Sequence, residues 1–75
     1  SIYPNPTQTE LSISTNKNLG NVAITVVDIN GRVVLEYRKE LFNTITLNTS
    51  QLQSGLYVLN IKGGNFNFNE KIIKN

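Results

Sequence analysis

Few side chains in this sequence could carry out chemistry, because two of the most versatile residue types are absent. The 75 residues contain no cysteine and no histidine. That composition excludes a thiolate nucleophile, an imidazole base and the usual zinc ligands. The acids are five scattered carboxylates, namely Glu10, Asp28, Glu36, Glu40 and Glu70. Their spacing pairs no two of them for acid–base catalysis, so we predict that the chain is not an enzyme.

Two short polar motifs each have a chemical and a structural interpretation. Asp28, Asn30 and Gly31 are spaced like the start of a calcium loop, but the glutamate that closes an EF-hand loop is missing. A β-turn explains the same residues, because an aspartate accepts main-chain N–H groups and glycine allows positive φ. Residues 48–50 fit the N-glycosylation pattern, and here too we favour a turn with side-chain caps. We predict no metal and no cofactor.

The net charge of +2 comes from one part of the chain. Near the C-terminus, Lys62, Lys71 and Lys74 are balanced only by Glu70. Three lysines are too few for a nucleic-acid-binding stripe, and the default interpretation is a solvated strand edge. No apolar run approaches the roughly 20 residues of a membrane-spanning helix. The first six residues do not resemble a signal peptide, so an export signal, if there is one, is expected elsewhere in a longer precursor.

Alternating apolar and polar residues predict β-strands along almost the whole chain. The clearest is 22–27, which is rich in β-branched residues and is followed by Asn30-Gly31 and a second β-branched run at 33–35. Asn-Gly between two such runs predicts a hairpin. Further strands are predicted at 11–14, 44–47, 56–62 and 66–74. The residues predicted to point inward are Leu11, Ile13, Val22, Ile24, Val26, Ile45, Leu47, Tyr57, Leu59 and Ile61.

The last predicted strand is irregular. Phe66, Phe68 and Ile72 share one parity, whereas Ile73 falls on the other side, which predicts a register break. In total we expect about seven short strands in an antiparallel sandwich, without a helix of useful length. We expect Tyr57 to lie in the core with its hydroxyl at the rim, as buried tyrosines do.

Four motifs occur in a specific order along the chain. They are YPNP at 3–6, VVDINGRVV at 26–34, LNTSQLQSGLY at 47–57 and EKIIK at 70–74. Each alone is weak, but together they make the chain similar to a type A C-terminal sorting domain of the type IX secretion system. The resemblance extends over essentially all 75 residues.

The resemblance implies a single domain over 1–75 with an immunoglobulin-like antiparallel β-sandwich of seven strands. It also implies a secretion signal. The outer-membrane translocon and its shuttle components would recognise the domain and pass an N-terminal cargo from the periplasm to the cell surface or the medium. A sortase-like peptidase would cut upstream of Ser1. No cofactor, nucleic acid or membrane span is implied.

By the same resemblance, 55–75 is the signal-bearing terminal hairpin and 1–8 is a linker with an incoming strand. The recognition residues carried over are Gly55, Tyr57, Lys71, Ile72, Ile73 and Lys74. The structural-motif residues are Tyr3, Pro4, Asn5, Pro6, Asp28, Asn30 and Gly31. We expect Lys71 and Lys74 to face an acidic or carbonyl-rich receptor surface, and the edge of the hairpin to dock by strand addition.

A different class of function stays open, namely an accessory adhesion or carbohydrate-binding sandwich. Sugar-binding faces usually present tryptophan or tyrosine, and this chain has no tryptophan and only Tyr3, Tyr37 and Tyr57. Binding to insoluble polysaccharides would separate that function from sorting. A structural spacer is a third possibility, and it predicts that deleting the domain leaves the localisation of the cargo unchanged.

Overall fold

Every regular element of the protein is a β-strand. The computed structural model describes residues 1–75. The strands are β1 (Ile2–Tyr3), β2 (Glu10–Val27), β3 (Val33–Asn48), β4 (Gly55–Lys62) and β5 (Asn67–Lys74). They form one antiparallel sheet in the order β1-β2-β4-β5, with β3 paired to β2 as well. The predicted all-β antiparallel class is therefore confirmed. The structure contains no helix with the length and apolar character needed to cross a membrane.

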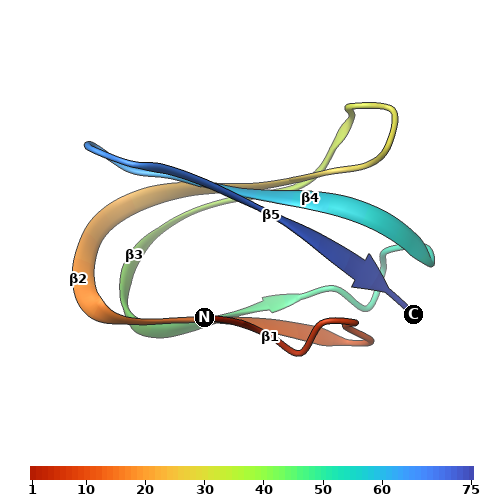
Figure 1. Cartoon of the computed structure of the whole chain (residues 1–75), viewed down its shortest axis with the longest axis horizontal. Helices are drawn as coiled ribbons and strands as arrows, with labels where there is room; N and C mark the ends of the chain where they lie inside the picture. The colour runs from red at the N-terminus through yellow and green to blue at the C-terminus, as the bar shows by residue number, and fades with distance from the viewer.

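The sheet curls because its two longest strands bend together (Figure 1). The first part of β2 pairs with β1 and with the end of β3, whereas its last part pairs with β4 and with the start of β3. Between these parts the β2–β3 register shifts at Asn18 and Gly20. Gly20 and Asn43, on facing strands, have φ of 69° and 70°. This left-handed backbone is tolerated best by glycine and asparagine.

The predicted number of strands differs from the observed one for a physical reason. Polar residues near the bends interrupt the apolar alternation, so the sequence predicts a strand end at each bend. In the structure the main-chain ladder continues through both bends, and two long strands take the place of four short ones. The structure therefore has five strands rather than about seven. The predicted seven-stranded immunoglobulin-like sandwich is not confirmed, because the five strands form one curled sheet.

The core lies inside the curl. It consists of the buried side chains Leu11, Ile13, Val22, Ile24, Val26, Leu41, Leu47, Tyr57, Leu59, Ile61 and Ile72. Nine of the ten residues predicted to point inward belong to this core, and the tenth, Ile45, packs against it partly buried. Leu41 follows a run of charged residues and was not predicted. Each fully buried aliphatic side chain contributes about 1.5–3 kcal/mol relative to an exposed one, so this cluster is the main source of stability.

The predicted register break in the last strand is wrong. β4 and β5 pair without a shift from Gly55 opposite Lys74 to Lys62 opposite Asn67. Ile73 simply lies on the outer face of the sheet, where it is 48% exposed, while Ile72 is fully buried. Phe68 shares the parity of Ile72 but is 45% exposed, because it lies near the bends of β2 and β3, where it lines an apolar depression together with Leu19 and Leu41. The apolar residues of β5 therefore occupy both faces of a regular strand.

Candidate functional site: the terminal hairpin

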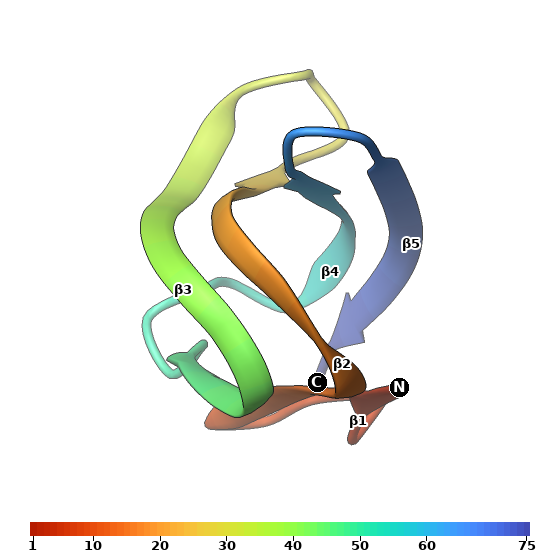
Figure 2. The same cartoon turned by 90° about the vertical axis from the view of Figure 1, so that its left-hand side faces the viewer.

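The candidate site is the hairpin of β4 and β5, which forms one wall of the curl (Figure 2). Its turn is closed by a hydrogen bond from Gly63 N–H to the Phe66 carbonyl oxygen, 3.0 Å long. Side chains alternate between the two faces of each strand. Paired residues of the two strands therefore share a face, and the register fixes which of the predicted recognition residues lie together.

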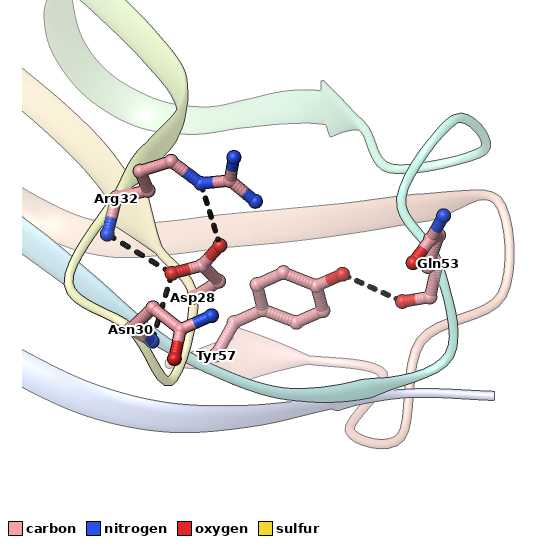
Figure 3. Close-up of polar contacts among 5 residues, drawn as sticks. All are labelled: Asp28, Asn30, Arg32, Gln53 and Tyr57. Carbon is pink, nitrogen blue, oxygen red and sulfur yellow. Dashed lines mark hydrogen bonds and ion pairs between the residues drawn. The ribbon is translucent and has the colours of Figure 1, made fainter.

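Two of the predicted recognition residues lie on the inner face. Tyr57 and Ile72 are direct cross-strand partners, and they are 7% and 0% exposed. The Tyr57 hydroxyl donates a hydrogen bond to the Gln53 carbonyl oxygen at 2.6 Å (Figure 3), so the prediction of a core aromatic with its hydroxyl at the rim is confirmed. Neither side chain can touch a receptor while the sheet stays closed. Their contribution is to hold the hairpin against the core.

Two other predicted residues lie on the outer face. Lys71 is exposed and Ile73 is 48% exposed. Their cross-strand partners are Val58 and Leu56, of which Leu56 is 43% exposed. We call these four residues the outer patch. Cross-strand partners have Cβ atoms about 4.5–5.5 Å apart, so three apolar side chains and one ammonium group form a continuous surface.

The structure does not bring Lys71 and Lys74 together. An odd spacing along a strand places two residues on opposite faces, and Lys74 lies on the inner face opposite Gly55. Lys74 is only 8% exposed, so its aliphatic stem is covered. The Lys74 ammonium group forms no hydrogen bond within the protein. Because every buried side-chain nitrogen has a hydrogen-bond partner, this ammonium group is not buried and reaches water. Long lysine side chains often combine a buried stem with a solvated end in this way.

Gly55 contributes through its backbone. Its φ is 154°, a value that other residues rarely adopt, and a Cβ added there would meet nothing within 4 Å. Conformation, rather than lack of space, is therefore the reason for glycine at this position. Gly55 is the first residue of β4, and its pairing with Lys74 forms one end of the β4–β5 ladder.

An N-terminal segment closes part of the outer edge of β5. The Asn5 side-chain amide donates to the Lys71 carbonyl oxygen and accepts from the Ile73 N–H, both at 3.0 Å. Thr7 N–H donates to the Ile73 carbonyl oxygen at 2.8 Å, and Asn75 N–H donates to the Thr7 carbonyl oxygen at 2.9 Å. We call residues 5–7 the edge clasp. The peptide bonds before Pro4 and Pro6 are cis.

The edge clasp is anchored in the interior by Thr7. Its side chain is fully buried, and its hydroxyl contacts the Glu10 carbonyl oxygen and the Thr49 hydroxyl, the latter at 2.9 Å. Thr49 is fully buried too, and its N–H donates to the Thr9 carbonyl oxygen. The sequence analysis placed Thr49 in a capped turn but did not predict that either threonine is buried, because a single threonine outside an alternating stretch carries no periodic signal.

The two polar motifs form turns, as predicted. Asp28 Oδ1 accepts from the main-chain N–H groups of Asn30 and Arg32, each at 2.9 Å (Figure 3). Gly31 in the same turn has a φ of 82°. The Arg32 N–H, followed by the Asn30 N–H and the guanidinium of Arg32, lowers the pKa of Asp28 below its ordinary value of 3.8. In the second motif, Asn48 Oδ1 accepts from the N–H and the hydroxyl of Ser50.

Comparison with known families places the whole chain in one of them. The family described as "Secretion system C-terminal sorting domain" matches residues 1–75. No curated protein matches the chain. The family match covers every element described above, including the edge clasp and the terminal hairpin. The chain therefore belongs to the C-terminal sorting domains of the type IX secretion system.

Proposed function

We propose that the domain directs a cargo fused at its N-terminus through the outer-membrane translocon, and that the translocon or a shuttle component reads the outer patch of the terminal hairpin. Membership of the family makes the chain a C-terminal sorting signal for type IX secretion, with export toward the cell surface or the medium. In this proposal the cargo and its domain pass from the periplasm to the translocon. A sortase-like peptidase cutting upstream of Ser1 then separates domain and cargo. The domain itself performs no catalysis.

The observation that carries the proposal is the composition of the outer patch. Leu56 and Ile73 expose 43% and 48% of their surface side by side, next to the exposed ammonium of Lys71. Contiguous apolar surface with a polar neighbour is typical of protein interaction sites. In this arrangement Lys71 and Ile73 make contact with the receptor. Tyr57, Ile72, Gly55 and the stem of Lys74 keep the hairpin in shape.

An export assay with a reporter protein fused to this domain tests the proposal. Lys71→Glu reverses the only charge of the outer patch, so we expect reporter export to fall while the fold, checked by circular dichroism, is retained. Lys17→Glu is the matched control, because Lys17 is exposed at the bend of β2. Lys74→Ala tests the inner-face lysine and should act through stability. Full export by a folded double variant, Lys71→Ala with Lys74→Ala, would contradict lysine-mediated recognition.

The carbohydrate-binding alternative has little support from the three tyrosines. Tyr57 is buried, Tyr37 is half-buried, and only Tyr3 is largely exposed, at 47%. A sugar platform needs at least one ring whose face is open to the ligand, and a single Tyr3 next to two prolines offers a small one. Retention of the purified domain on insoluble polysaccharide would revive this alternative.

A further inference from the structure

The outer edge of β5 is half closed and half open. The edge clasp is hydrogen-bonded to three main-chain groups on this edge, namely the Lys71 C=O, the Ile73 N–H and the Ile73 C=O. Along an antiparallel pair, alternate residues direct their N–H and C=O groups to the same side. Asn67 and Asn69 therefore direct both groups to this edge, together with the Lys71 N–H, and no strand pairs with them there. We call these groups the open edge.

The other edges of the sheet carry features that discourage pairing with a foreign strand. β1 is only two residues long and runs into Pro4 and Pro6. β3 bends at Asn43, shifts its register and carries the charged run 38–40. Charges, prolines, bends and short length are the usual means of protecting an edge. The open edge is short, but it has no charge, no proline and no register shift between Asn67 and Asn69.

The open edge is also held in a fixed register. The Asn60 side-chain amide donates to the side-chain oxygens of both Asn67 and Asn69. These two residues lie in uninterrupted register with β4. The edge is therefore preorganised as a template, which lowers the entropic cost of pairing with an added strand.

We propose that a component of the secretion machinery adds an extended strand to the open edge of β5, and that the edge clasp ends this pairing at Lys71. The inference rests on the proposed sorting function and assigns the backbone part of the same recognition. Strand addition gives affinity through main-chain bonds and specificity through alternate side chains. The added strand lies beside Lys71 on the outer face, with Lys62 on the same face but one strand further away, on β4, whereas Glu70 is on the inner face. A partner strand with acidic residues on that face matches the charge.

A second copy of the domain is a poorer occupant. Two β5 strands paired antiparallel about Asn69 would share only the stretch from Asn67 to Lys71, because the clasp of each copy closes the rest. Stable protein interfaces bury about 1,200–2,000 Å² in total, far more than so short a pairing offers. A translocon strand can also use the outer patch beside the edge.

Proline substitution separates the backbone contribution from the side chain. Asn69→Pro and Asn69→Ala both lose the bond to Asn60, but only proline removes the outward N–H. Neither removes a main-chain hydrogen bond to β4, since the N–H of Asn69 faces away from it, and proline is tolerated at such edge positions. Asn67→Pro and Asn67→Ala form a second matched pair at the first residue of the strand. All are made as fusions of a reporter with the whole domain, and folding is checked by thermal melting.

We expect each proline variant to fold and to lower the export rate, measured at subsaturating expression, on the order of tenfold below its alanine partner, because a partner carbonyl is left unbonded. Equal export of proline and alanine variants overturns the inference while the sorting function stands. Loss of folding in both proline variants overturns it too, because the N–H groups then do not face outward. A wild-type fusion that is dimeric and a proline variant that is monomeric would assign the edge to a second copy. Failure of the wild-type domain to raise export above that of the bare reporter would instead contradict the proposed function.

Discussion

Neighbouring isoleucines at the end of β5 should respond to truncation in opposite ways. Ile72 is fully buried opposite Tyr57, and replacing it by alanine should cost about 2–5 kcal/mol, the range for a buried isoleucine. A core of this size supplies a net stability of roughly 3–5 kcal/mol, so Ile72→Ala should leave a large fraction of the domain unfolded at room temperature. Ile73 already exposes 48% of its surface. Its truncation should cost about 1 kcal/mol, half of the value for a fully buried side chain.

The two substitutions are compared by urea unfolding of the purified domain and by export of a reporter fusion. Ile72→Ala should lose folding and export together, whereas Ile72→Val, costing about 0.5–1.5 kcal/mol, should keep both. Ile73→Ala should keep its unfolding transition and lose export, because it removes half of the exposed apolar pair of the outer patch. Equal destabilisation by the two alanine substitutions would refute the assignment of Ile72 to the inner face and Ile73 to the outer face.

Three further substitutions test polar contacts in the β2–β3 turn, the core and the edge clasp, all by urea unfolding. Asp28 has a lowered pKa in the folded state, so its stabilising effect is present above the ordinary pKa of 3.8 and is lost as the pH falls below it. The difference in free energy of unfolding between wild type and Asp28→Ala should therefore shrink as the pH falls below 3.8 and stay constant at higher pH. Tyr57→Phe keeps the ring and removes the bond to a main-chain carbonyl, and should cost about 0.5–1.5 kcal/mol. Thr7→Val leaves the Glu10 carbonyl oxygen without its donor and the buried Thr49 hydroxyl without its acceptor, and should cost about 1–3 kcal/mol, whereas Thr9→Val, at an exposed position, should change little.

The sequence was a good guide wherever one face of a strand is buried over several consecutive alternations. Val22, Ile24 and Val26 lie inward as predicted, because a slip by one residue would expose all of them. It was a poor guide at the bends of β2 and β3. There each strand continues because its partner strand bends with it. The pairing that maintains such a strand involves residues far away in the sequence, so it produces no local alternation of apolar and polar residues. Gly20, which suggests a turn by itself, instead supplies the backbone angle for the bend.

The candidate site shows the same division. The inward position of Tyr57 followed from its strand alternation, and the opposite faces of Lys71 and Lys74 follow from their odd spacing, a signal that the sequence contains but that the expectation of a shared lysine surface did not use. The edge clasp could not be predicted. Asn5 and Ile73 are 68 residues apart, and no periodicity connects them. Contacts of this kind depend on where the folded sheet brings its two ends.

The geometry explains why a sorting signal of this kind takes the form of a folded domain. In a free peptide with the sequence of β5, the side chains of Lys71, Ile72 and Ile73 would not be assigned to fixed faces. Pairing with β4 places Ile72 in the core and its two neighbours outside, and a slip of one residue would exchange the faces. The edge clasp adds bonds to both Lys71 and Ile73 that only one register satisfies. The YPNP motif at 3–6 therefore fixes the register of the EKIIK motif at 70–74, because Asn5 of the first is bonded to Lys71 and Ile73 of the second.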